Sequence, residues 1–215
     1  MKTYDLKKEW PLILVTLAPI IYIMSIWSQL PLKVPMHWNA QGEIDRYGSR
    51  KELLILSIAL PIFMYVLMFI IPLIDPKKKI NERTKGYIRI RQALAILISF
   101  LTIFIIYSSL TASMTQPAFI FVAIGLLIAV IGFYMKDLPP NYFVGIKTAW
   151  TLENKEVWKK THQFSSKLWL WLGVVLAVSA LILDINQLMP VFYVIIAITV
   201  ILPFAYSYIL YQKLS

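Results

Sequence analysis

Residues 92–135 read QALAILISFLTIFIIYSSLTASMTQPAFIFVAIGLLIAVIGFYM and contain no charged side chain. A helix needs about 20 mostly apolar residues to cross a bilayer, so this run of 44 residues is long enough for two crossings. A polar patch at 108–117 interrupts the run near its middle. We therefore predict two membrane helices here, 92–110 and 118–135, joined by a short loop.

Four further runs with few charges predict four more helices, at 11–30, 53–74, 167–184 and 189–211. The first run is too long for the hydrophobic region of a cleaved signal peptide, and no small-residue cleavage site follows it. The expected fold is an all-α polytopic bundle of six transmembrane helices. We expect a single membrane domain over 1–215, with an N-terminal part at 1–110 and a C-terminal part at 111–215.

The composition excludes several classes of protein. Of the 215 residues, 59% are hydrophobic and only 15% are charged, whereas soluble domains have about 25% charged residues. Cysteine is absent, which excludes disulfides, iron–sulfur clusters and thiol nucleophiles. With only two histidines, a metal site of three histidines is impossible. No cofactor is expected.

The positive charge is distributed unevenly between the two sides of the predicted bundle. Both termini, the loop 75–91 and the segment 136–167 together carry 17 Lys and Arg residues, and the loop 31–52 carries four. Because cytoplasmic loops are enriched in these residues, we predict that both termini are cytoplasmic. The seven cations of 75–91 are also expected to contact anionic lipids, and no direct contact with nucleic acid is expected.

No Lys, Arg, Asp, Glu or His lies in the middle of a predicted helix. Ion-coupled transporters usually place such a residue at the middle of the membrane. Recognition or chemistry is therefore expected in the two long loops, the extracytoplasmic loop 31–52 and the cytoplasmic segment 136–166.

The extracytoplasmic loop is rich in polar groups. Two prolines favour an extended entry, Asn39–Gly42 is typical of a tight turn, and Gly48 indicates a second turn or the approach to the next helix. One interpretation is a folded cap, in which Asp45 pairs with Arg46 or Arg50 and the imidazole of the loop bonds within it.

Two other interpretations of this loop remain open. It is a recognition surface for an external ligand if His37, Trp38 and Asn39 are presented outward. It is a metal site if His37, Asp45 and Glu43 converge, because imidazole and carboxylate groups are metal ligands. The spacing, however, matches no calcium loop and no zinc helix motif.

The cytoplasmic segment combines turn and helix signals. Gly145 permits an unusual backbone angle or close packing, and Thr151 is predicted to cap a helix that begins at Leu152 and continues into the fifth membrane helix. Four residues of that helix fall along one stripe. They are Trp158, His162, Ser165 and Trp169.

Two interpretations of this segment compete. In the first, it is an amphipathic helix at the inner lipid interface, with tryptophans at headgroup depth and lysines facing anionic lipid. In the second, Lys147 with Thr148 and Thr151 binds an anion or the acidic surface of a partner. The spacing is not that of a phosphate-binding loop.

Each long loop carries a motif. The outer motif is PMHWN at 35–39, followed by Gly42, Asp45 and YGS at 47–49. The inner motif is NYFVGIKTAWTL at 141–152, followed by VWKKTH at 157–162. Together they resemble the SdpI family of bacterial immunity proteins, which has an N-terminal domain of unknown function and a C-terminal signature that usually reads Gly-Ile-Arg-Thr-Pro-Trp-Thr-Leu. Lys147 replaces the usual Arg, and Ala149 replaces the usual Pro.

The resemblance implies a membrane protein that is not an enzyme and that protects its cell from a secreted antimicrobial peptide toxin. It further implies, for some members, a cognate transcriptional repressor held at the membrane. The residues expected to contact the toxin outside are His37, Trp38, Asn39, Gly42, Asp45 and Gly48. The residues expected to serve a cytoplasmic partner, or to brace the bundle, are Asn141, Gly145, Lys147, Thr148, Trp150, Thr151, Trp158 and His162.

Two other functions remain open from the sequence. A small transporter or exporter would remove a peptide or lipid, although the missing charge at mid-membrane does not favour coupled transport. A membrane metalloenzyme would need a metal site, and the predicted topology places His37 and His162 on opposite sides of the membrane.

Overall fold

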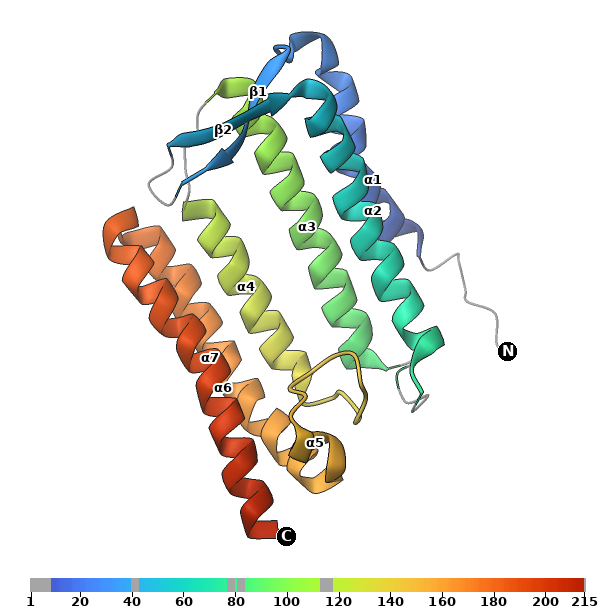
Figure 1. The fold of residues 1–215 in the computed structure, drawn as a ribbon, viewed down its shortest axis with the longest axis vertical. Coiled ribbons are helices and arrows are strands. Elements are labelled where there is room, and N and C mark those ends of the chain that lie inside the picture. The colour runs from blue at the N-terminus through green and yellow to red at the C-terminus, as the bar shows by residue number, and fades with distance from the viewer. Residues whose placement is uncertain (1–8, 40–42, 77–79, 81–83, 113–117, 215) are drawn as a thin grey trace. The chain divides into compact units, whose positions relative to one another are not determined.

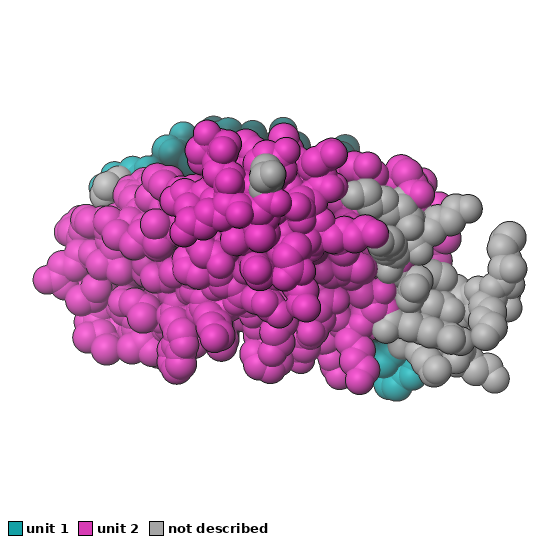
Figure 2. Space-filling model, turned by 90° about the horizontal axis from the view of Figure 1, so that it is seen from below, with its two compact units in different colours: residues 1–67, 94–120 teal, residues 68–93, 121–215 magenta. Residues whose placement is uncertain are grey.

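The computed structural model describes residues 9–39, 43–76, 80, 84–112 and 118–214. Figure 1 shows the order of the helices and strands along the chain. The helices are α1 Trp10–Ser25, η2 Trp27–Gln29, α2 Arg50–Ile74, α3 Lys85–Thr111, α4 Ala118–Met135, α5 Ala149–Glu153, α6 Lys155–Ile182 and α7 Ile185–Leu214. The chain divides into two compact units, coloured in Figure 2: unit 1 has residues 1–67 and 94–120, and unit 2 has residues 68–93 and 121–215.

Helices suitable for crossing a membrane account for most of the chain. By length and composition, α2, α3, α4, α6 and α7 can each cross a bilayer, and α1 is a shorter apolar helix of 16 residues. Each of the six predicted helices is therefore present, which confirms the fold class. The start of α3 was predicted wrongly: the helix begins at Lys85, because backbone hydrogen bonding continues past the charged residues that end the apolar run.

Unit 1 contains a β-hairpin that the sequence did not predict. Strands β1 Lys33–Trp38 and β2 Ile44–Ser49 pair antiparallel, with Val34 opposite Gly48 and an irregular register around His37. Gly48 lies within β2, two residues before α2 begins at Arg50, so the predicted second turn is wrong and the alternative, the approach to the next helix, is confirmed. The tight turn predicted for 39–42 includes 40–42, which lie outside the described residues.

A small apolar core supports the hairpin in unit 1. It consists of Ile23, Ile26, Leu30, Val34, Leu53 and Ile106. Val34 of β1 therefore packs in the same apolar core as residues of the helices. The hydroxyl of Ser109 on α3 also donates to the carbonyl oxygen of Pro35 over 2.7 Å. These contacts hold β1 against the helices of unit 1.

In unit 2, small residues allow α4 and α6 to approach closely. A Cβ atom added at Gly173 of α6 would lie 2.4 Å from the backbone nitrogen of Ala129 on α4, and one added at Gly132 would lie 2.5 Å from the backbone nitrogen of Leu170. Small residues at such contacts are typical of membrane helices, where close packing replaces the hydrophobic effect. An apolar cluster formed by α4, α6 and α7 continues this packing.

We predict that Gly173→Ala destabilises the protein by about 1–3 kcal/mol, because the added methyl group meets the backbone of α4. Helix propensity alone predicts the opposite sign, since alanine is favoured over glycine by about 1 kcal/mol within a helix. The measurement is the thermal unfolding midpoint of the detergent-solubilised protein. Val178→Ala, at a largely exposed position of the same helix, is the control. A rise in the midpoint for Gly173→Ala would contradict the close contact.

Candidate functional site

A buried histidine organises the segment that joins α4 to α6. His162 of α6 has no exposed surface, and its Nε2 atom accepts a hydrogen bond from the backbone N–H of Ile146 over 3.1 Å. Its Nδ1 atom lies 2.8 Å from the carbonyl oxygen of Trp158. An accepting Nε2 carries no proton, so Nδ1–H is the donor to Trp158. The imidazole is therefore neutral, and both of its nitrogens are used.

The glycine before Ile146 is required for this contact. Gly145 has a φ angle of +117°, which side-chain-bearing residues rarely adopt. A Cβ atom there would also lie 2.5 Å from Nε2 of His162. The prediction of an unusual backbone angle at Gly145 is confirmed. The indole of Trp158 stacks on the imidazole of His162 with ring centroids 4.0 Å apart.

The turn before Gly145 is held from inside by one amide side chain. Asn141 is fully buried, and its Oδ1 accepts from the backbone N–H groups of Phe143 and Val144 over 2.8 and 2.7 Å. Its Nδ2 donates to the carbonyl oxygens of Pro139 and Val144. Both ends of the amide are therefore occupied by the backbone of the turn.

Lys147 closes the same turn from its exposed side. Its Nζ atom donates to the carbonyl oxygens of Tyr142 and Phe143 over 3.2 and 3.0 Å. A carbonyl accepts from an ammonium group without the planar, two-pronged geometry that a carboxylate prefers from arginine. The replacement of the usual arginine by Lys147 therefore preserves a positive donor at this turn.

The short helix α5 and the long helix α6 each have their own N-terminal cap, and neither cap is the predicted residue, Thr151. Thr148 caps α5, and its side chain and that of Thr151 form a reciprocal capping box. Asn154 then caps α6 by accepting from the N–H groups of Glu156 and Val157. The predicted helix start at Leu152 is wrong, because Thr151 pairs with the cap three residues earlier.

The tryptophans of this region hydrogen-bond within unit 2. Trp158 is almost fully buried, and its Nε1 donates to the carbonyl oxygen of Leu138 over 2.9 Å. The interpretation of Trp158 as a lipid anchor is therefore wrong. Trp150 is half-buried, donates to Ser207 of α7 and packs its ring edge against Phe204.

The predicted stripe on α6 is the buried face of the helix. Trp158, His162 and Ser165 are buried, and Trp169 is half-buried with its Nε1 donating to the carbonyl oxygen of Thr199 on α7 over 3.0 Å. The spacing therefore identified one face correctly. What covers that face is the α4–α6 segment and α7 rather than lipid.

The second predicted site lies on the β-hairpin of unit 1. His37 Nδ1 lies 2.6 Å from Oδ1 of Asp45 across the strands, and both side chains are exposed. In the described part of the chain Asp45 pairs with His37, so the predicted pairing with Arg46 or Arg50 is wrong. The register shifts on both sides of His37, which is paired with Arg46, and leaves Asp45 without a paired residue in β1, so the regular alternation of side chains is interrupted where Asp45 meets the imidazole. Arg50 instead lies over the ring of Trp27 at 4.9 Å.

The rest of the hairpin site is partly buried. Trp38 has 9% of its surface exposed, so the expectation that it is presented outward is wrong. Asn39 bonds to Glu43 through its Oδ1, which accepts from the backbone N–H over 2.9 Å, and through its Nδ2, which donates to the carboxylate over 3.0 Å. Gly42 lies outside the described residues. Within the described ranges no three His, Asp or Glu side chains converge as metal ligands.

Both loop motifs lie in regions of the chain that match known protein families or domains. Residues 137–207 match the SdpI/YfhL protein family, and residues 14–60 match a domain of unknown function, DUF1648. Over 211 residues the chain is 23% identical to "Immunity protein SdpI" of Bacillus subtilis (strain 168), covering 98% of this chain and 99% of that protein. An uncharacterized protein of Archaeoglobus fulgidus is 46% identical over 50 residues, which are 23% of this chain and 27% of that protein. No solved structure gives a significant match.

The helices and these matches define the class: a multi-pass protein of the bacterial cell membrane. More specifically, residues 137–207 match the SdpI/YfhL protein family, residues 14–60 match the DUF1648 domain, and the whole chain is similar to an SdpI immunity protein. The resemblance seen in the two motifs is thereby confirmed. The hairpin lies in the DUF1648 region, and the segment around His162 lies in the SdpI region.

We predict that Gly145→Ala destabilises the protein by more than about 2 kcal/mol. A positive φ costs an alanine roughly 1–2 kcal/mol, and the added Cβ also meets the imidazole of His162. Thermal unfolding in detergent measures the loss. Glu153→Ala, at an exposed position of α5, controls for the purification of a variant from the same segment. Equal midpoints for the two variants would contradict the requirement for glycine.

Ala149 stands where the family signature usually has proline, and this difference predicts a stabilising substitution. Ala149 is the first residue of α5, where proline is favoured, and Thr148 has the extended conformation that proline prefers in its predecessor, with φ −102° and ψ 163°. Ala149→Pro should therefore stabilise the protein by about 0.4–1 kcal/mol. The control is Leu152→Pro, which removes the backbone bond to the carbonyl oxygen of Thr148. If both variants lower the unfolding midpoint, the assigned helix start is incorrect.

Proposed function

We propose that this protein is an integral membrane immunity protein that protects its cell from a secreted antimicrobial peptide toxin. The observation that carries the proposal is the relationship to Immunity protein SdpI, which extends over 98% of this chain and 99% of that protein. A relationship of that extent includes the hairpin, the membrane helices and the segment around His162 together. It therefore supports a shared role of the whole chain and not only of one domain.

We further propose that the protein acts by binding and not by catalysis. Both nitrogens of His162 are occupied by backbone groups, so this imidazole has no free donor or acceptor for a substrate. The other imidazole, His37, is exposed and paired with Asp45 on a hairpin. That arrangement suits recognition, because an exposed polar pair is accessible to a ligand and exchanges its hydrogen bonds to water for hydrogen bonds to that ligand.

The toxin-contacting surface in this proposal is the exposed side of the β-hairpin. The His37–Asp45 pair and the Asn39–Glu43 pair present imidazole, amide and carboxylate groups together. Such a mixture complements an amphipathic peptide better than a uniformly charged surface does. The positive-inside prediction places this hairpin outside the cell, where a secreted toxin arrives.

The segment from Asn141 to His162 serves mainly as a brace in this proposal. Its buried side chains Asn141, Thr151 and His162 bond to the backbone of the same segment. If a cytoplasmic repressor is held at the membrane, its contacts on this segment are with exposed groups such as Tyr142 and Lys147. The buried residues then act on such a partner only by holding those groups in place.

The test is survival of a toxin-sensitive bacterial strain challenged with an SDP-type peptide. Cells express the wild type, His37→Ala, Lys33→Ala or empty vector. We expect the wild type to protect. We expect His37→Ala to lower the tolerated toxin concentration about tenfold or more, because a hydrogen bond to a charged group contributes about 1.5–3 kcal/mol. Lys33→Ala removes an exposed side chain of the same strand outside the predicted site and should retain protection.

The amount of each variant in the membrane is measured by immunoblot, so that loss of protein is distinguished from loss of recognition. If the wild type is present in the membrane but survival equals that of the empty vector, the immunity function is contradicted for this toxin. If His37→Ala protects as fully as the wild type, immunity stands and the role given to the hairpin fails.

A further inference from the structure

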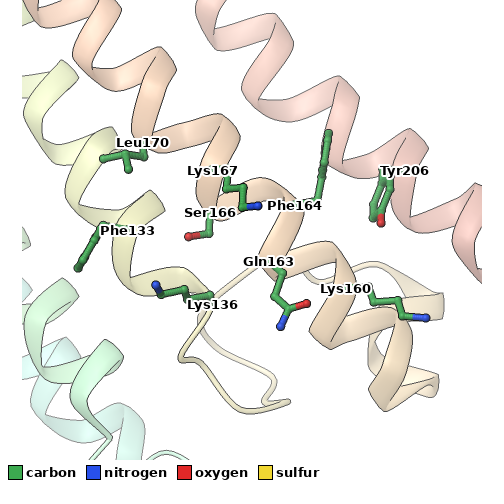
Figure 3. A pocket seen from close by; sticks show the side chains of 9 residues that line it. All are labelled: Phe133, Lys136, Lys160, Gln163, Phe164, Ser166, Lys167, Leu170 and Tyr206. Atoms are coloured by element: carbon green, nitrogen blue, oxygen red, sulfur yellow. The ribbon is translucent and has the colours of Figure 1, made fainter.

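A cationic pocket lies in unit 2 where α4 ends beside α6 and α7, and of the two loop motifs only the inner one contributes to its lining, through Lys160. Its volume is about 570 Å³, and its lining comes from α4, the residue that follows it, α6 and α7, as Figure 3 shows. Its polar and charged lining includes Lys136, Lys160, Lys167, Gln163 and Tyr206. Neither the immunity proposal nor the buried histidine uses these side chains.

The pocket has an excess of positive charge. Its lining contains three lysines and no carboxylate. Lys160 is partly compensated by Glu156 at 3.5 Å, one turn earlier on α6. Lys136 lies 5.1 Å from the ring centre of Phe133, a contact that leaves its charge uncompensated. An anion placed here would therefore be attracted by at least two ammonium groups.

The walls of the pocket are apolar. Phe133 and Leu170 line it, and the rings of Phe164 and Tyr206 stack on each other with centroids 4.4 Å apart. A free inorganic anion has no apolar part that such walls would contact. A molecule with an anionic head and hydrocarbon chains would use both kinds of surface.

The position along the helices corresponds to the depth of lipid headgroups. Lys136 directly follows the last residue of the apolar helix α4, and Lys167 stands at the start of the apolar part of α6. The positive-inside prediction puts this end of both helices at the cytoplasmic leaflet. Basic pockets between membrane helices on that side are suited to anionic headgroups.

We propose that this pocket binds the phosphate headgroup of an anionic phospholipid, with the acyl chains lying along the apolar wall at Phe133 and Leu170. The ammonium groups of Lys136 and Lys167 pair with the phosphate, Lys160 adds to the positive potential of the pocket, and Gln163 and Tyr206 supply hydrogen-bond donors. This assignment is independent of toxin immunity, because it uses neither the hairpin nor the buried histidine.

The test measures lipid binding by the purified full-length protein in native mass spectrometry, with phosphatidylglycerol and phosphatidylcholine of equal chain length. The test variant carries Lys136→Gln, Lys160→Gln and Lys167→Gln. The control variant carries Lys155→Gln, Lys159→Gln and Lys213→Gln, which remove the same charge from exposed positions outside the pocket. A third arm adds inorganic phosphate as a competitor, and thermal unfolding verifies that both variants are folded.

We expect the wild type and the control variant to prefer phosphatidylglycerol, and the test variant to lose about tenfold or more of that preference, since each lysine near an anionic surface strengthens binding about fivefold. Inorganic phosphate should not displace the lipid. Equal losses in the two variants would overturn the proposal in favour of a general charge effect. Displacement by phosphate at similar concentrations would overturn it in favour of a free-anion site.

Discussion

The hydrogen bond from the backbone N–H of Ile146 to Nε2 of His162 is the interaction on which the α4–α6 segment depends. It joins a loop residue to a buried face of α6 sixteen residues later. A buried backbone N–H without a partner would cost about 1–3 kcal/mol, and a buried imidazole with an unused acceptor would add to that cost. Pairing the two removes both penalties, provided that the residue before Ile146 is a glycine with positive φ.

The remainder of the motif follows from the same need to satisfy buried polar groups. Asn141 closes the turn that delivers Gly145, Thr148 and Thr151 cap α5, and Asn154 caps α6. Each side chain replaces a hydrogen bond that water would supply in an open loop. The motif is therefore best understood as an internal framework that leaves Tyr142 and Lys147 at the surface.

The two loops differ in how their polar residues are used. On the β-hairpin, His37 and Asp45 pair at the surface, where both side chains are exposed to solvent. On α6, by contrast, His162 is neutral and buried beneath the ring of Trp158. The same residue type is thus part of an exposed ion pair in one region and of a buried framework in the other, and the difference lies in burial and in the partner of each ring nitrogen.

The sequence by itself determined the membrane helices, because the transfer of an apolar run into a bilayer depends on local composition. The run 92–135, for example, requires two helices wherever it lies in the fold. Periodicity likewise identified the common face of Trp158 and His162, and Gly145 could be predicted to have an unusual backbone angle. The tertiary structure alone decided which surface covers that face, which partner Asp45 takes, and that residues 33–49 form a hairpin. Those outcomes depend on contacts between residues far apart in the chain, or on the direction in which a strand points each side chain, and neither is a property of a local stretch of sequence.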